Sequence, residues 1–280
     1  MLECFCNNDN FTILNTKDYL YKGLNTFKYK ICNNCGSFYL IDYEEISNNY
    51  NTNYYSIVNK VQRKPNNFRS LRFTSNSLFS KFLRIIKPLS LYDKIVTDFI
   101  KLNNPIVLDF GSGTSTYIKF LNTINLLKTQ GYSYDPYSKD TDTITDFKNI
   151  PFQNINLIIS NQAFEHLPDL KYTIENLYNL TKNDCNLIFS VPVVGSVLTS
   201  FLEYSFTLQA PDHISILSLH SWMKLIVNSK WKVVSIYQDT QSQKAYYDKS
   251  KNLKLKYNST LPVKLFNNAI SDNMIFHLSK

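Results

Sequence analysis

Two glycines follow an acidic residue near the end of an apolar run, at Asp109, Gly111 and Gly113. Glycines let the backbone turn tightly and approach a ligand where a side chain would collide with it. A second apolar stretch ends in Asp135. An acid at the end of the next strand accepts both hydroxyls of a ribose. These residues therefore predict a nucleoside-binding crevice at the carboxyl ends of parallel strands.

Four of the chain's 5 cysteines form two close pairs near the N-terminus: Cys4 with Cys6, and Cys32 with Cys35, which Gly36 follows. Two such pairs are typical of the arrangement around one tetrahedral zinc ion. The first pair has a shorter spacing than usual. Buried thiols without a metal are the alternative, because free cysteine packs as a small apolar residue.

From residue 106 onward, short apolar runs alternate with longer stretches of helical periodicity. That alternation predicts an α/β fold of the Rossmann type, a parallel sheet with helices on both faces. We expect three regions: a cysteine-rich zinc-ribbon-like module (1–58), a basic linker and helix (59–104), and the α/β domain (105–280). Strands are expected at 106–110, 132–135, 155–160, 187–191, 231–237 and 274–278, and helices at 116–128, 169–180 and 219–229. A further amphipathic helix is expected where apolar residues recur from Leu91 to Ile100, and Asn103-Asn104-Pro105 would end it.

The motifs of residues 105–240 resemble the class I S-adenosylmethionine-dependent methyltransferases. The resemblance comprises the Asp-x-Gly-x-Gly loop, the acid after strand two, Glu165-His166-Leu167 after strand four, and a strand five that ends in Pro192. Dehydrogenases are the main competitors, but their pyrophosphate requires a third glycine where Thr116 stands. Two departures from the methyltransferase pattern are Ser115 at the usual third glycine and Asn156 at the usual strand-four acid. A catalytically inactive cofactor-binding scaffold therefore stays open as an alternative.

The resemblance implies a role for several residues in binding S-adenosylmethionine. Asp109, Gly111 and Gly113 would line its methionine part, and Asp135 would hold its ribose. Beside the adenine would lie Asp146 and Phe147, and beside the transferable methyl group Asn161 and Gln162.

Two histidines are the candidates for catalysis. Methyl transfer to a hydroxyl needs alignment and a base. His213 matches the family's histidine in the loop after strand five, and His166 sits in the Glu-His-Leu motif. We expect His213 to be the base, with Asp212 able to hold its ring; a purely structural role is the alternative for both histidines.

The N-terminal stretch also resembles the zinc-ribbon leaders of bacterial-type methyltransferases that act on sugars. We therefore expect a sugar or other small hydroxylated metabolite as acceptor, in glycan biosynthesis, and a structural zinc.

The net charge of +8 is spread over scattered lysines. Nucleic acid is therefore not the expected partner, although RNA methylation is the alternative activity. No apolar run reaches the length of a membrane span, and the absence of a signal peptide predicts a cytoplasmic protein. The arginines cluster and would suit an anionic acceptor: Arg63, Arg69, Arg72 and Arg84.

Overall fold

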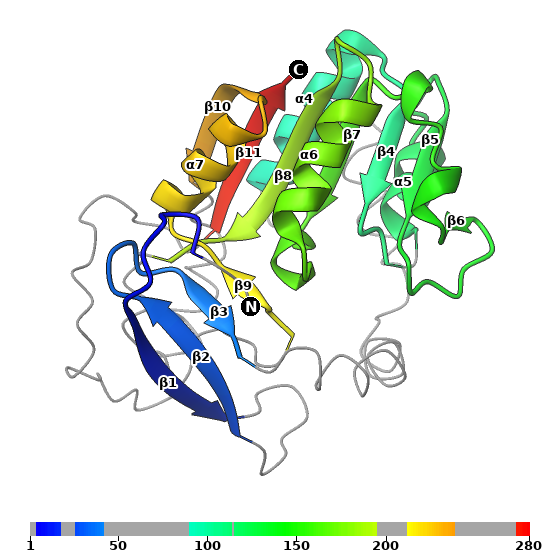
Figure 1. Ribbon diagram of the computed structural model, residues 1–280. Helices are drawn as coiled ribbons and strands as arrows, with labels where there is room; N and C mark the ends of the chain where they lie inside the picture. Colours follow the sequence, from blue (N-terminus) through cyan, green and yellow to red (C-terminus); the bar gives the residue numbers. More distant parts are fainter. Residues whose placement is uncertain (1–3, 18–25, 42–89, 114, 195–211, 239–272) are drawn as a thin grey trace, which may run out of the picture. The chain divides into compact units, whose positions relative to one another are not determined.

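The computed structural model describes residues 4–17, 26–41, 90–113, 115–194, 212–238 and 273–280 (Figure 1). The chain divides into two compact units. The first unit comprises Met1–Ser47, Gln162–Asn179 and Ser190–Lys280, and the second comprises Asn48–Asn161 and Leu180–Phe189. The arginine cluster of the sequence lies outside the described residues.

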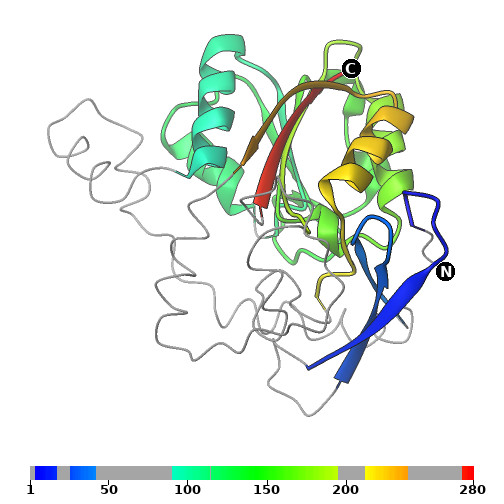
Figure 2. The ribbon, with the colours of Figure 1, turned by 90° about the vertical axis from the view of Figure 1, so that its left-hand side faces the viewer.

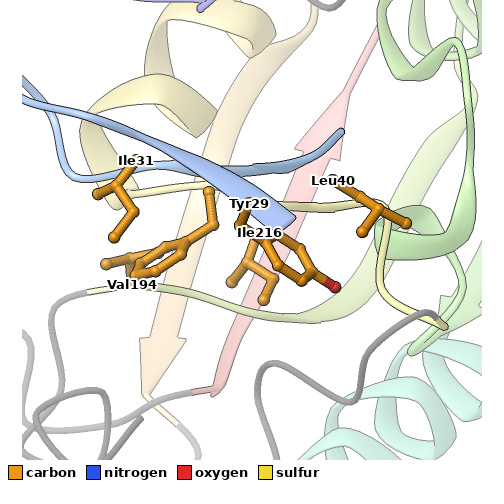
Figure 3. Close-up of a cluster of buried hydrophobic side chains, with 6 residues drawn as sticks. Tyr29, Ile31, Leu40, Val194 and Ile216 are labelled. Carbon is orange, nitrogen blue, oxygen red and sulfur yellow. The ribbon is translucent and has the colours of Figure 1, made fainter. Parts of the chain in front are cut away.

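A four-stranded antiparallel sheet forms in the first unit, in the order β1-β2-β3-β9. Its strands are β1 (Phe11–Lys17), β2 (Thr26–Cys32), β3 (Phe38–Leu40) and β9 (Ser215–Ile216). Phe38 of β3 pairs with Ile216 of β9, so the cysteine-rich region takes its fourth strand from far along the chain. Figure 3 shows part of the apolar cluster that holds these strands together. Its members are Tyr29, Ile31, Phe38, Leu40, Val194 and Ile216.

A seven-stranded sheet has the order β10-β11-β8-β7-β4-β5-β6. β4 pairs in parallel with β5 on one side and with β7 on the other, and β10 pairs antiparallel with β11. The chain thus runs outward from β4 through β5 to β6 and returns to β7. Such a reversal of strand order creates a ligand crevice at the carboxyl ends of the strands around it. The bounds are β4 (Val107–Phe110), β5 (Gly131–Tyr134), β6 (Thr143–Ile144), β7 (Leu157–Asn161), β8 (Asn186–Pro192), β10 (Lys232–Gln238) and β11 (Asn273–Ser279).

Among the described residues, the second unit has two α-helices, α4 (Leu91–Asn103) and α5 (Thr116–Thr123). The hydroxyl of Ser90 caps α4 by accepting a hydrogen bond from the amide of Asp93 at 3.0 Å. Asn104 ends α4 in the left-handed conformation, and Pro105 follows. Both signals are typical helix boundaries, because asparagine tolerates positive φ and proline cannot continue a helix.

The first unit contributes α6 (Leu170–Leu180) and α7 (Leu219–Asn228). Trp222 of α7 is almost fully buried, and its ring lies 5.8 Å from that of Phe276 in β11. Figure 2 shows α7 along the β10–β11 pair. The indole of Trp231 donates a hydrogen bond to the carbonyl of Ile174 in α6 at 3.2 Å. Buried aromatic rings thus fix both helices to the strands of this unit.

The expected fold class is confirmed, and the ends of most expected elements differ only slightly from the observed ones. The expected helix 116–128 is an exception, since α5 ends at Thr123. Asn125 adopts a positive φ of 50°, which a continuing helix does not allow. The strands β1, β2, β3, β6 and β9 were not predicted. No helix in the described part of the chain is long and apolar enough to cross a membrane.

Candidate functional site

The glycine loop follows β4 in the second unit. Gly111 and Gly113 have φ angles of 73° and 60°, which side-chain-bearing residues rarely adopt. A Cβ atom added to Gly113 would meet no atom of the described residues within 4 Å, so the space that these residues leave beside Gly113 is open. The amides of Gly111 and Ser112 donate to the carbonyl of Tyr134 at 2.8 and 3.0 Å. The end of β5 therefore fixes the loop, and the side of the loop next to Gly113 is left open for a ligand.

Asp135 directly follows β5 and holds the same loop through its side chain. Its Oδ2 accepts a hydrogen bond from the amide of Gly113 at 2.9 Å, and its Oδ1 accepts from the amide of Tyr137 at 2.9 Å. Only 7% of Asp135 is exposed. The two sequence motifs, the glycine loop and the acid after the next strand, thus meet at the reversal point of the sheet.

Asp109, in β4 just before the glycine loop, is a second buried carboxyl group in this region. Burial, together with the negative charge of Asp135, raises the pKa of Asp109 to about 7. Asp109 and Asp135 are close enough for the charge of one to affect the other. Such a pair of acids favours a positively charged ligand, because a nearby cation stabilises the ionised carboxylates. S-adenosylmethionine carries a sulfonium and an ammonium group. The residues present therefore fit this cofactor.

Ser115 stands where methyltransferase loops usually have a third glycine. It is buried and adopts a φ of 57°, the left-handed conformation that a glycine would take without strain. Its hydroxyl is hydrogen-bonded to that of Thr143 in β6. The serine therefore keeps the backbone shape of the loop, and its side chain points to a partner inside the fold.

The residues expected beside the adenine lie on the same unit. Asp146 is exposed, and its Oδ1 accepts from the amide of Lys148 at 2.9 Å, which caps a short 3-10 helix, η1 (Phe147–Asn149). The ring of Phe147 lies 5.7 Å from that of Tyr134 and 5.0 Å from that of Phe152. This half-buried aromatic surface is of the kind on which a flat base can stack.

Asn161 and Gln162 end strand β7 and begin the next segment. Asn161 is exposed. Gln162 has a φ of 55°, and its side-chain nitrogen donates to Ser190 Oγ at 3.0 Å. The side chain of Gln162 is therefore positioned within the first unit. Asn156, at the family's usual acid position, donates to Asp184 at 3.3 Å.

The comparisons with known proteins agree with this reading of the fold. The family profile described as "Methyltransferase domain" matches residues 79–236, more than half of the chain. The chain belongs to this family and is a methyltransferase with the Rossmann-like fold. A search of curated protein sequences found no significant match.

Several solved structures are similar to the chain at low identity. An S-adenosylmethionine-dependent methyltransferase from Mesorhizobium loti is 10% identical, with 68% of this chain and 98% of that chain covered and a TM-score of 0.45. One from Archaeoglobus fulgidus is 12% identical, with 73% and 100% covered and a TM-score of 0.42. An O-methyltransferase of a trans-AT PKS multienzyme from Brevibacillus brevis, in complex with S-adenosyl-L-homocysteine, is 14% identical, with 67% and 71% covered and a TM-score of 0.41.

A cluster of acids and histidines lies in the first unit, and we call Glu165, His166, Asp212 and His213 the acid–histidine cluster. The Nε2 atoms of His166 and His213 each lie 3.9 Å from Oε1 of Glu165. The two imidazole rings are 4.9 Å apart in a T-shaped arrangement. Both predicted catalytic histidines therefore converge on one carboxyl group.

Backbone contacts from three segments hold this cluster in place. Glu165 and His166 lie in a short 3-10 helix, η3 (Phe164–His166). The amide of Ile214 donates to the carbonyl of Glu165 at 2.8 Å. The hydroxyl of Tyr29 in β2 donates to the carbonyl of His213 at 2.6 Å. The N-terminal sheet thus supports the segment that carries His213.

Burial changes the acid–base behaviour of the two carboxyl groups in the cluster. Glu165 is 1% exposed, and burial raises its pKa to about 8. Burial also raises the pKa of Asp212 to about 7. Glu165 was not among the residues predicted to be functional, although its place in the Glu-His-Leu motif next to His166 is a signal for a role.

The four N-terminal cysteines are brought together as expected. Their sulfur atoms all lie within 4.8 Å of one another, and all four residues are buried. Neighbouring sulfurs are 3.2 Å apart for Cys4 and Cys6, 3.4 Å for Cys4 and Cys35, and 3.3 Å for Cys6 and Cys32. Zinc–sulfur bonds of about 2.3 Å in a tetrahedron place the sulfurs about 3.8 Å apart. The cluster therefore fits a zinc ion after a small expansion.

Hydroxyl groups surround one of these sulfurs. The hydroxyl of Ser221 donates to Cys35 Sγ at 3.2 Å, and Ser37 Oγ lies 3.2 Å from the same sulfur. The hydrogen bond with Cys4, and after it those with Ser221 and Ser37, hold the pKa of Cys35 well below its ordinary value although burial opposes this. A thiolate is the form that binds metal. The amide of Ser218, the N-terminal cap of α7, donates to Ser37 Oγ at 2.9 Å, which links the cysteines to that helix.

Proposed function

We propose that the chain transfers a methyl group from S-adenosylmethionine to a hydroxyl of a sugar or another small hydroxylated metabolite, in glycan biosynthesis. The single observation that carries the cofactor assignment is that two buried acids, Asp109 and Asp135, lie beside an open glycine loop where the strand order of the sheet reverses. The preference for a sugar rests on the resemblance of the N-terminal region to the zinc-ribbon leaders of sugar-acting methyltransferases.

The residues that would hold S-adenosylmethionine are those of the second unit around this loop. Asp109 offers negative charge to the methionine part, and Asp135 offers carboxylate oxygens to the ribose hydroxyls. Phe147 supplies an aromatic surface for the adenine. The remaining members of the proposed cofactor site in the second unit are Gly111, Gly113, Asp146 and Asn161. Gln162, which the resemblance also implied, belongs to the first unit, where its side chain donates to Ser190.

The acid–histidine cluster is the proposed place where the acceptor hydroxyl loses its proton, with His213 and His166 as catalytic residues. In the transfer, the bond between sulfur and the methyl carbon breaks and a bond between oxygen and that carbon forms. The hydroxyl proton has to leave, and sugar hydroxyls are poor nucleophiles until it does. Removal of a proton in this way contributes roughly 10²- to 10⁴-fold to a rate.

Cys4, Cys6, Cys32 and Cys35 are the proposed ligands of one structural zinc ion. Such an ion would join the turn before β1 to the β2–β3 turn and thereby hold the four-stranded sheet, which includes β9. Zinc supplies folding free energy to small modules that have little apolar core of their own.

Radioactive methyl transfer from S-adenosylmethionine tests the function. The purified chain is incubated with free sugars, nucleotide-sugars and structured RNA in parallel, with Asp135→Ala as the control for cofactor-dependent signal. We expect label in one of the sugar-containing pools. Label in RNA alone, with binding that weakens steeply with salt, would support RNA methylation instead.

A further inference from the structure

We propose that Glu165, His166 and His213 bind a divalent transition-metal ion, at a second metal site that is separate from the four cysteines. Each residue offers one ligand atom, and these three atoms all lie within 4.8 Å of one another. Two imidazoles and one carboxylate are a common ligand set for zinc and neighbouring metals. This proposal deepens the proposed function, because it says how the acid–histidine cluster would act on an acceptor.

The distances fit an ion better than they fit direct contacts. Each histidine Nε2 lies 3.9 Å from Glu165 Oε1, which is too long for a hydrogen bond. Two ligands on one zinc ion, at about 2.1 Å each, are about 3.0–3.4 Å apart at bond angles of 90–109° and about 4.2 Å apart when they lie opposite. The three side chains therefore surround a gap of the right size, and only a small contraction would bring them into bonding distance.

Glu165 lacks the hydrogen bonds that a buried carboxyl group ordinarily has. It is 1% exposed, and neither of its carboxylate oxygens has a hydrogen-bond partner among the described residues. An unpartnered buried carboxyl group is costly, and a bound cation removes most of that cost. An ion would thus supply the interaction that this side chain lacks.

The orientation of His166 also matches that of a metal ligand. Its Nδ1 lies 2.8 Å from the carbonyl oxygen of Asp212 and 3.1 Å from Oδ1 of the same residue. The carbonyl oxygen can only accept, so in the neutral ring Nδ1 carries the proton and the lone pair is on Nε2, the nitrogen nearer Glu165 Oε1. Metal-binding histidines usually donate their second ring nitrogen to a carboxylate or carbonyl in this way.

Three protein ligands leave at least one coordination position on the ion for an oxygen of the substrate. A hydroxyl bound there would lose its proton to water more readily, because the ion stabilises the alkoxide. The two histidines would then contribute to catalysis as ligands of the ion. The chemical class expected at the open position is an alcohol or a carbohydrate diol.

Metal stoichiometry tests this site directly. Wild-type protein, Glu165→Gln and the control Glu175→Gln, a half-buried glutamate of α6, are saturated with zinc, dialysed against metal-free buffer and analysed for zinc per chain. The difference between wild type and Glu165→Gln decides the test, because the four cysteines contribute equally to both. We expect Glu165→Gln to hold about one equivalent less zinc than wild type and Glu175→Gln to hold the same amount.

Equal zinc content in wild type and Glu165→Gln would overturn the proposal. Should the variant not fold, zinc titration of the chelator-treated wild type by calorimetry replaces it. Binding of zinc at two classes of site in this titration would support the proposal, and binding at a single class of site would overturn it. Transfer of radioactive methyl by a wild-type protein that lacks the second zinc equivalent would reject the metal site and leave the proposed methyltransferase function intact.

Discussion

Asp212 contacts His166, with 3.1 Å between Oδ1 and Nδ1, although its neighbour in the chain is His213. From the sequence, Asp212 was a candidate to hold the ring of His213. The carbonyl oxygen of Asp212 lies 2.8 Å from the same nitrogen, so Asp212 orients the histidine of the Glu-His-Leu motif through its backbone, although the two residues are distant in sequence.

Replacement of His213 tests its proposed catalytic role. We expect His213→Asn to lower turnover by about a hundredfold or more, because the acceptor proton would no longer be removed efficiently, while the affinity for S-adenosylmethionine is unchanged. The exposed His220 of α7 offers a matched control as His220→Asn, which should keep wild-type turnover. Turnover of His213→Asn within about threefold of wild type would reject the catalytic role.

The raised pKa of Asp109 predicts a pH-dependent stability. In the unfolded chain this carboxyl group ionises near pH 3.8, but in the folded protein it does so only near pH 7. Between these values the folded state binds more protons than the unfolded state, so the contribution of Asp109 to stability falls as the pH rises. Asp109→Asn should therefore stabilise the cofactor-free protein more at pH 7.5 than at pH 5, by on the order of 2–4 kcal/mol.

Denaturant unfolding of the two proteins at both pH values measures this effect. All other titrating groups are shared, so the change in the difference between the two free energies of unfolding isolates Asp109. A difference that is the same at both pH values would show that Asp109 ionises normally in the folded protein.

The left-handed conformation of Ser115 predicts a clear order of stability among its variants. Ser115→Ala loses the hydrogen bond to Thr143 and keeps the unfavourable backbone conformation, at a cost of about 1–2 kcal/mol. Ser115→Gly loses the same bond but gains a residue that adopts this φ freely. We expect the glycine variant to be more stable than the alanine variant by about 1 kcal/mol, measured by thermal unfolding. The reverse order would argue against the left-handed conformation.

Zinc removal should act on the N-terminal sheet. Protein purified without chelator should contain at least one zinc per chain, and Cys32→Ser should contain one fewer. Because β9 pairs with β3, we expect amides of Ser215 and Ile216 to exchange faster with deuterium in the variant, while those of β4 stay protected. Less than about half an equivalent of metal in the wild type would refute the zinc site.

The main features of the α/β domain were predictable because they are local. Strand β4 and its glycine loop occupy consecutive residues, and Asp135 follows the next apolar run. The pattern of apolar residues and the glycines of the turn therefore suffice to find them. Pairing between distant segments was not predictable. Nothing in the short segment Ser215–Ile216 indicates that it adds to the strand Phe38–Leu40, because that pairing depends on the tertiary fold. The convergence of His166 and His213 on Glu165 also depends on the tertiary fold.

Binding of S-adenosylmethionine by wild type and Asp135→Ala, measured by calorimetry, tests the central claim most directly. Asp135 holds the glycine loop by accepting a hydrogen bond from the amide of Gly113, and in the proposed cofactor site its carboxylate would bind the ribose. Loss of charge-assisted hydrogen bonds costs roughly 1.5–3 kcal/mol, so we expect the affinity to fall about ten- to a hundredfold. Equal affinity in the two proteins, or no binding by the wild type, would contradict a cofactor site at the ends of β4 and β5.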